Sequence, residues 1–151
     1  MNLNKYFVSK VDIDLKYLAG FFDGEGSVAV YSNSDHRGYC LRFQLGQNVS
    51  PQSTIIAEFL KKTYGVHLHV SGTLSGKKKY NMALSGWKAA FLLEQLKPYL
   101  IIKRDQVELA LEWHYKKPKI QRLATGRIAK FPKKYFTYSK KVAAKLKAMK
   151  Q

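Results

Sequence analysis

Residues 17–27 read YLAGFFDGEGS, an apolar run that ends in a carboxylate between two glycines. The apolar residues follow the helical period, so we expect a helix that is buried on more than one side. Gly20 and Gly24 are four residues apart and share one face of that helix. Each glycine costs about 1 kcal/mol relative to alanine in a helix, but paired small residues let a second backbone pack closely. The stretch therefore predicts a close helix–helix contact that leads into Glu25.

The size and composition are those of one globular domain. The chain has 151 residues, 46% of them hydrophobic, which suffices for a single core and excludes general disorder. No apolar run approaches the roughly 18 residues of a bilayer span, and the N-terminal residues lack the apolar region of a signal peptide. The single cysteine, Cys40, excludes an intrachain disulfide. We expect an intracellular, soluble protein with no membrane partner, in the cytoplasm or nucleoid of a prokaryote or in an organelle.

The charge is strongly basic, with 27 Lys and Arg against 10 Asp and Glu, a net charge of +17. Residues 113–151 hold 13 of these basic side chains and no acidic one. Such a field attracts polyanions, and nucleic acid is the leading candidate because the chain has no amphipathic anchor or lipidation signal. A basic surface that serves only solubility is the alternative.

Hydrophobic periodicity and turn signals alternate along the chain after a loose arm up to Val11. They first predict a helix from Asp12 or Asp14 to about Gly24, followed by strands over 28–31 and 39–47. A second helix, capped by Ser50 and Pro51, stops at Gly65 and is followed by strands over 66–71 and 78–84. Three more helices are predicted from Ser85 to Leu96, from about Arg104 to Tyr115, and from Ser139 to about Met149. This order predicts an α+β fold, with helices on one face of a four-stranded antiparallel sheet. Residues 1–115 form the core, and 116–151 form a basic helical extension of the same domain.

The sheet face that points away from this core is rich in donors and acceptors that can read base edges or hold phosphates. Any solvated face is polar, but this one has cations and no anion, which favours DNA. His67 and His69 have a spacing that suits a metal on a strand, but no third ligand is near them. The expected DNA-contacting residues are Tyr31, Asn33, Arg37, Arg42, Gln44, His67, His69, Lys77, Lys79 and Asn81.

Residues 18–26, LAGFFDGEG, closely resemble the signature of the LAGLIDADG homing endonucleases. The predicted α-β-β-α-β-β-α order over about residues 12–115 is similar to that family. Residues 43–47 resemble a second-strand segment whose last glutamine lies by the cleavage site. Residues 96–103 resemble the stretch whose final lysine serves the active site. The segment from Lys116 onward lies outside the resemblance, and we expect its basic side chains to hold flanking phosphates without reading sequence.

The resemblance implies an intron-encoded endonuclease that hydrolyses phosphodiester bonds in double-stranded DNA, at a long, near-palindromic site. Its expected catalytic residues are Glu25, Gln47 and Lys103. Glu25 and the Gly24 carbonyl would hold Mg²⁺, which takes one or two carboxylates together with phosphate and water. Mn²⁺ or Ca²⁺ would occupy the same site, Ca²⁺ without cleavage. Gln47 would orient the attacking water, and Lys103 would stabilise charge on the phosphate.

Simpler roles for the same residues are a helix cap for Glu25 and solvated side chains for Gln47 and Lys103. Two departures from the family pattern affect the site. Glutamate replaces the commoner final aspartate, and no basic residue follows Gln47, so Lys103 is expected to carry more of the electrostatic load. Asp23 is expected to be structural, through a hydrogen bond to turn backbone or to a partner helix.

Only one signature is present, whereas a double-strand cut needs two carboxylate sites. The resemblance therefore implies a homodimer with Gly20, Gly24 and Ala19 at the contact. Two other functions stay open. One is a non-cleaving nucleic-acid-binding protein on this fold, such as an RNA splicing maturase or a transcription regulator. The other is a ribosomal-type RNA-binding protein, which gives no reason for paired small residues before Glu25.

Overall fold

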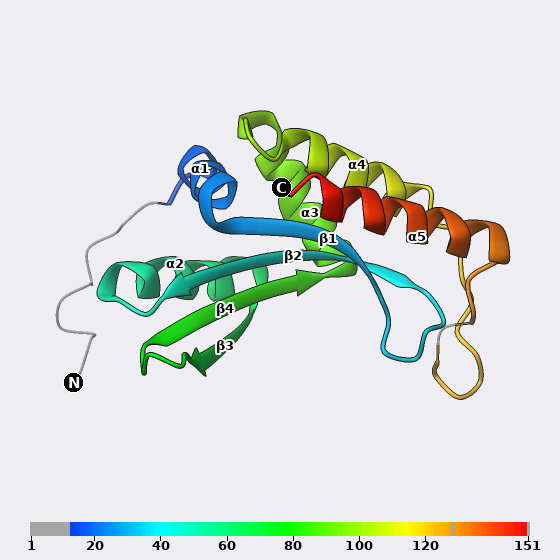
Figure 1. The fold of residues 1–151 in the computed structure, drawn as a ribbon, viewed down its shortest axis with the longest axis horizontal. Coiled ribbons are helices and arrows are strands. Elements are labelled where there is room, and N and C mark those ends of the chain that lie inside the picture. Colours follow the sequence, from blue (N-terminus) through cyan, green and yellow to red (C-terminus); the bar gives the residue numbers. More distant parts are fainter. Residues whose placement is uncertain (1–12, 128, 151) are drawn as a thin grey trace.

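The computed structural model describes residues 13–127 and 129–150 (Figure 1). Its elements are α1 (Leu15–Glu25), β1 (Gly26–Ser32), β2 (Tyr39–Asn48), α2 (Pro51–Tyr64), β3 (His67–Gly72), β4 (Lys78–Ser85), α3 (Gly86–Leu96), a 3₁₀ turn (Lys97–Tyr99), α4 (Arg104–Tyr115) and α5 (Lys133–Ala148). The predicted order of helices and strands is confirmed. The expected arm up to Val11 lies outside the described residues. Among those described, no helix has the length and apolar character of a bilayer span.

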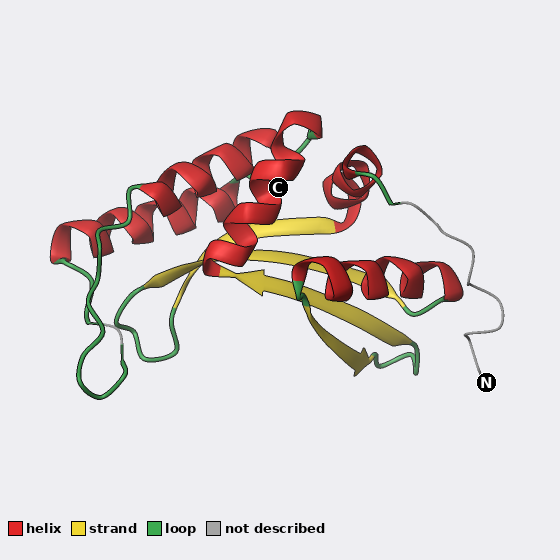
Figure 2. Cartoon of the chain, turned by 180° about the vertical axis from the view of Figure 1, so that it is seen from behind, coloured by secondary structure: helices red, strands yellow, loops and turns green. Residues whose placement is uncertain are grey.

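The four strands form one antiparallel sheet in the order β1-β2-β4-β3. The register sets Gly26 opposite Leu45, Phe43 opposite Leu84 and Leu68 opposite Met82. The helices cover one side of the sheet and leave the other side open (Figures 1 and 2). The predicted α+β architecture, with helices on a single face, is confirmed.

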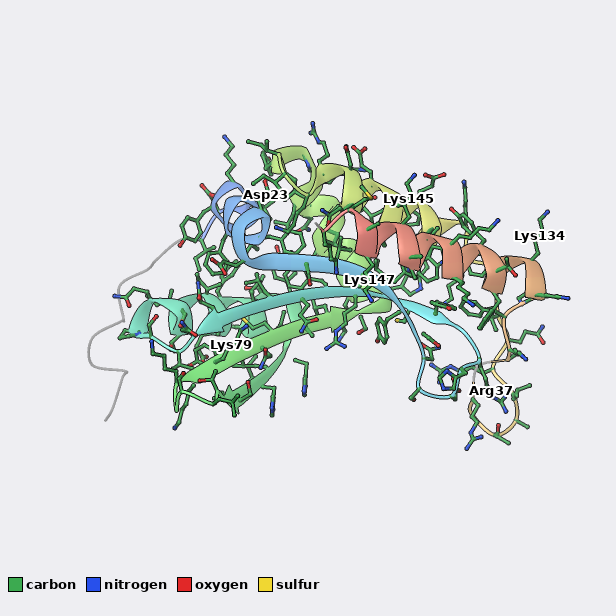
Figure 3. All side chains as sticks on the ribbon, viewed as in Figure 1. Asp23, Arg37, Lys79, Lys134, Lys145 and Lys147 are labelled. Atoms are coloured by element: carbon green, nitrogen blue, oxygen red, sulfur yellow. The ribbon has the colours of Figure 1, made fainter. Side chains whose placement is uncertain are left out.

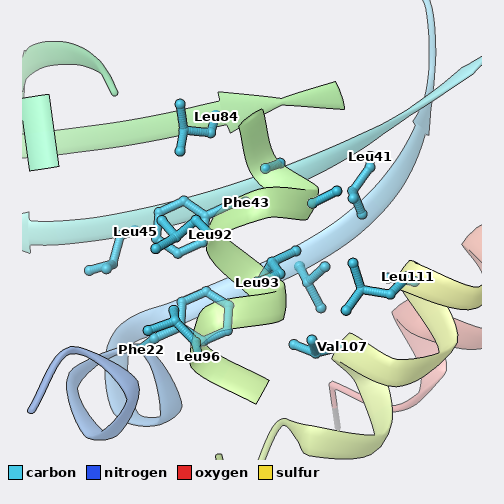
Figure 4. Close-up of a cluster of buried hydrophobic side chains, with 14 of the residues drawn as sticks. Phe22, Leu41, Phe43, Leu45, Leu84, Leu92, Leu93, Leu96, Val107 and Leu111 are labelled. Carbon is cyan, nitrogen blue, oxygen red and sulfur yellow. The ribbon is translucent and has the colours of Figure 1, made fainter. Parts of the chain in front are cut away.

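The core fills the space between the covered sheet face and the helices (Figure 4). Phe22 of α1 stacks on Phe43 of β2 with ring centroids 4.9 Å apart, and both side chains are fully buried. Leu93 and Leu96 of α3 are also fully buried in this cluster. Because removing apolar surface from water is the main favourable term in folding, this cluster fixes α1 and α3 against β2.

Local signals in the sequence set several helix ends. The Asp14 side chain accepts a hydrogen bond from the Tyr17 N–H (2.7 Å) and starts α1. Ser50 caps α2 by accepting from the Ser53 N–H (3.0 Å), and Gly65 ends that helix with a φ of 68°. Ser85 precedes α3, as predicted, but its side chain makes no capping hydrogen bond. Its hydroxyl lies instead 3.3 Å from the Tyr31 hydroxyl.

The last helix, α5, is longer than predicted, because it begins at Lys133 instead of Ser139. Tyr135 stacks on Trp113 of α4 with centroids 5.8 Å apart, and its hydroxyl donates to the Trp113 carbonyl (2.8 Å). The indole N–H of Trp113 donates in turn to the Ser139 hydroxyl (2.8 Å). Val142 and Leu146 are buried as well. The basic extension therefore contributes directly to the core.

Candidate active site and nucleic-acid interface

The carboxylate of Glu25 lies where α1 passes directly into β1. Gly26 makes this junction possible, because a Cβ at that position would clash with the Phe22 ring. Glu25 is exposed and takes part in no ion pair among the described residues. The last carbonyls of a helix lack intrahelical partners and carry the negative end of its dipole. The end of α1 thus presents oxygen donors and negative potential to solvent.

Asp23 lies on α1 (Figure 3), and its carboxylate bonds to the backbone just before α4. One carboxylate oxygen accepts from the backbone N–H groups of Ile101 (2.7 Å) and Ile102 (3.2 Å), and the other accepts from that of Lys103 (2.9 Å). Asp23 is only 8% exposed. Its expected structural role is confirmed, but the expected partner was wrong. Asp23 bonds to backbone about 80 residues later, not to a nearby turn or a partner helix.

Lys103 precedes α4, and its ammonium group donates a hydrogen bond to the carbonyl oxygen of Asp23. This contact holds the cation at the end of α1, two residues before Glu25. The Asp23 carboxylate fixes the backbone of the same lysine. The structure therefore places Lys103 at the last turn of α1, the helix that ends at Glu25.

Gln47 lies near the end of β2. Gly26, the first residue of β1, pairs with Leu45 of β2. The next residues of β2, Gly46 and Gln47, therefore extend past the start of β1 and run alongside the end of α1. Gln47 pairs with Tyr80 and has the strand parity of Leu45, which places it toward the helix-covered side. Its side-chain oxygen accepts from the Asn48 N–H (3.0 Å). The amide thus belongs to the segment of β2 that runs past the junction of α1 and β1.

The donors at the end of α1 suit a hard cation, although the set from one chain is small. The described residues contain no cluster of three or more His, Cys, Asp or Glu side chains that could hold a metal. The oxygen donors at the end of α1 are the Glu25 carboxylate and the Gly24 carbonyl. Mg²⁺ accepts such a set because it keeps several waters and shares phosphate oxygens. His67 and His69 on β3 have no third ligand of those types in the described chain.

The open face of the sheet is free of negative charge. None of the four strands, which the structure describes throughout, contains an Asp or Glu. The register sets Gln44 opposite Ala83 and Ala83 opposite His67, so that these positions form a row across three strands. The expected DNA-contacting residues that fall on strands all have this parity, namely Tyr31, Arg42, Gln44, His67, His69, Lys79 and Asn81. Asn33, Arg37 and Lys77 lie in the adjoining loops.

A second basic surface, which the sequence did not predict as a unit, lies where the 116–132 loop meets the β1–β2 loop. The Phe131 N–H donates to the Arg37 carbonyl (2.8 Å), and the Phe131 ring lies so close to Gly38 that a Cβ there would clash. Arg37 and Lys134 lie at the same end of the molecule (Figure 3). A groove of about 700 Å³ at this junction is lined by His36, Lys130, Phe131, Lys133, Phe136, Thr137 and Lys140.

One face of α1 is exposed and apolar. Apart from the helix's own backbone, a Cβ at Gly20 or Gly24 would meet no atom of the described residues within 4 Å. Tyr17, which is 56% exposed, stacks on Phe21 beside them with ring centroids 6.4 Å apart. Ala19, in contrast, is fully buried in the chain's own core. The expectation that Ala19 contributes to a contact between chains was therefore wrong, because its side chain points inward.

No protein-family model and no curated protein matches this sequence. Among solved structures, the chain is similar to the homing endonuclease I-CvuI in complex with its target in the presence of Ca (21% identity, TM-score 0.62, covering 89% of this chain and 80% of that one). It is also similar to the LAGLIDADG meganuclease I-AabMI bound to uncleaved DNA (24% identity, TM-score 0.51, covering 68% of this chain and 36% of that one). A third similar structure is the LAGLIDADG homing endonuclease I-SmaMI bound to cleaved DNA (20% identity, TM-score 0.54, covering 69% of this chain and 36% of that one). The chain thus spans about a third of the two longer chains.

Proposed function

We propose that this chain, which has the fold of the LAGLIDADG homing endonucleases, is a site-specific DNA endonuclease that uses a divalent metal and acts as a homodimer. The observation that carries the proposal is that Asp23 and Lys103 tie the start of α4 to the end of α1, which carries Glu25, while β2 carries Gln47 past the start of β1. These residues come from the end of α1, the start of α4 and the end of β2. If Glu25, Lys103 and Gln47 had separate surface roles, the hydrogen bonds of the buried Asp23 carboxylate that hold α1 to the start of α4 would not be needed.

The open face and the groove beside it would bind duplex DNA. The face has no acidic residue on its strands, and the groove adds Lys130, Lys133 and Lys140. A basic, concave surface lined by polar side chains suits both the phosphate backbone and the base edges of the major groove. The structures of I-CvuI, I-AabMI and I-SmaMI contain DNA, which supports the same partner here.

At the proposed active site, Glu25 and the Gly24 carbonyl would hold Mg²⁺, which would polarise the phosphate and stabilise the attacking and leaving oxygens. Ca²⁺ or Mn²⁺ would fit the same oxygen donors. Lys103 would place a positive charge against the phosphate oxygens as negative charge grows on them. Gln47 cannot titrate in the relevant range, so its amide would orient the attacking water by a hydrogen bond. Asp23 would position Lys103 without touching the substrate.

A double-strand cut requires a second copy of this site. The exposed face of α1, with Gly20, Gly24, Tyr17 and Phe21, would pack against the same face of another chain and set two Glu25 residues side by side. The DNA target would then be near-palindromic, because a two-fold axis relates the two halves.

The proposal is tested by incubating the protein with a randomised duplex library and Mg²⁺, and sequencing the resulting ends. We expect staggered double-strand ends at one family of related sites, and no such ends when a chelator removes the metal. Recovery of bound but intact duplexes would favour a non-cleaving DNA-binding protein on this fold. Preferential recovery of RNA in a parallel selection would favour a splicing or ribosomal role.

A further inference from the structure

A notch of about 410 Å³ lies at the end of the sheet where β4 passes into α3. Tyr31, Arg42 and Ser85 line it from three adjacent strands, and the register sets Arg42 directly opposite Ser85. His67 lines it from the start of β3, and Lys88 reaches it from the first turn of α3. The notch thus combines side chains of the open face with a lysine from the helical layer.

The charges in the notch are all of one sign. Arg42 and Lys88 are the cations that line it, His67 adds an imidazole ring, and no acidic residue lines it. None of the three forms an ion pair with a carboxylate in the described part of the chain. Gly65 also lines the notch, and a Cβ there would lie 3.7 Å from the Lys88 ammonium, so the missing side chain leaves room for this cation. Clustered cations without a counter-charge favour an anionic ligand.

Arg42 is held in place before any ligand binds. Its guanidinium carbon lies 5.5 Å from the centre of the Tyr31 ring, a cation–π contact. The Tyr31 hydroxyl is 3.3 Å from the Ser85 hydroxyl, which anchors the ring. The Nε atom of Arg42 is buried and has no hydrogen-bond partner among the described residues. The guanidinium is thus oriented by the Tyr31 ring and not by a carboxylate of the described residues.

We propose that this notch binds one phosphate group of the DNA backbone, so that Arg42 and Lys88 position the duplex and do not read a base. The inference rests on the proposed function and extends it to a residue, Lys88, outside the open face. Arginine's planar fork matches two phosphate oxygens, lysine adds a point charge, and the Ser85 hydroxyl adds a donor. Leu45, three residues after Arg42 on β2, pairs with Gly26 at the end of α1. Arg42 therefore lies roughly 10 Å along the strand from the end of α1. The contact is therefore separate from the proposed cleavage site.

The first test needs no DNA. The full-length protein is titrated with inorganic phosphate while its NMR spectrum is followed, together with Lys88→Gln and the matched control Lys62→Gln, an exposed lysine of α2 outside the notch. We expect saturable shifts at residues 65–67 and 85–88 in the wild-type and control proteins, and at least a tenfold weaker response in Lys88→Gln. Absent shifts, or equal responses in all three proteins, would overturn the proposal.

The second test measures duplex affinity against salt concentration. Loss of one phosphate contact in Lys88→Gln should reduce the slope of log Kobs against log salt by about 1, with unchanged base preference, whereas Lys62→Gln keeps the wild-type slope. An unchanged slope in Lys88→Gln, or relaxed preference at one base pair, would contradict a phosphate contact and indicate base reading. If the wild-type protein binds no duplex, the proposed function fails, and the phosphate titration still decides the notch.

Discussion

Asp23 is the side chain on which the geometry of the proposed site depends most. Its buried carboxylate accepts three backbone hydrogen bonds from residues 101–103 and so fixes Lys103 beside the end of α1. We expect Asp23→Ala to lower the free energy of unfolding by about 3 kcal/mol, because three backbone N–H groups lose a charged, buried acceptor. Urea denaturation followed by circular dichroism measures the loss.

Asp23→Asn serves as the control, because it keeps one acceptor oxygen and the size of the side chain. It should therefore cost clearly less than Asp23→Ala. Equal stability of Asp23→Ala and the wild type would show that these bonds do not hold the two helices together.

His114 should make the fold sensitive to mild acid. The side chain is buried, and burial lowers the pKa of its imidazole below the ordinary value, with repulsion from Lys117 as a further cause. The unfolded chain therefore binds a proton more readily than the folded chain. The stability that neutral His114 contributes is fully present above about pH 6.5 and falls as the pH drops below it, down to the folded-state pKa.

Thermal unfolding at about pH 7.5 and about pH 5.5 tests this expectation. The wild-type protein and His69→Gln, which changes an exposed histidine, should lose stability on acidification, whereas His114→Gln should lose less. The same acid sensitivity in all three proteins would assign the effect to other groups.

The sequence predicted the chemistry of single residues better than their partners. The family resemblance marked Glu25, Gln47 and Lys103, and the fold sets them at the end of α1, the end of β2 and the start of α4. The Asp23 contact joins positions about 80 residues apart, and no local pattern encodes it. Ala19 was assigned to the wrong side of α1 because small residues on both sides of that helix look alike in the sequence.

At the scale of elements, α1 has two faces with opposite tasks. Phe22 and Leu18 are fully buried in the core, whereas no described residue outside α1 comes within 4 Å of a Cβ built at Gly20 or Gly24. We expect Gly20→Leu to keep the fold, or to stabilise the monomer by up to about 1 kcal/mol, because leucine favours helix more than glycine does. The same change should weaken dimerisation at least tenfold in sedimentation equilibrium, because the larger side chain separates the two helices.

Gln52→Leu is the matched control, since it adds the same side chain to an exposed position on α2. It should leave the association constant unchanged. Unaltered dimerisation of Gly20→Leu would place the contact between chains on another surface.

Helix ends with local chemistry were predictable, and those set by distant packing were not. Asp14, Ser50 and Gly65 act where the sequence placed them. The start of α5 was predicted six residues too late, because Lys133 and Lys134 hide the apolar pattern. Tyr135 stabilises that first turn by packing on Trp113 of α4, a contact that only the folded chain creates. Val70 of β3 also departs from its alternating pattern, since it remains 47% exposed.

At the scale of the whole molecule, charge and fold divide the surface. The strands carry no acidic residue, and the basic 116–132 loop meets the β1–β2 loop at one end of the open face. The sequence predicted both the α+β order and the excess of positive charge, because each is a property of many residues together. The basic groove at the junction of the two loops was not predictable, since it depends on how Phe131 packs against Gly38.

The central claim is that Glu25 makes this fold a DNA-cleaving enzyme, and one paired measurement tests it. Binding and Mg²⁺-dependent cleavage of a duplex recovered from the library are compared for the wild type, Glu25→Gln and Glu58→Gln, an exposed glutamate of α2. We expect Glu25→Gln to bind the duplex within about threefold of the wild type and to cut it at least about 10²-fold more slowly, because it loses the carboxylate that holds the metal. Glu58→Gln should bind and cut as the wild type does. Cleavage by Glu25→Gln at the wild-type rate would contradict the account.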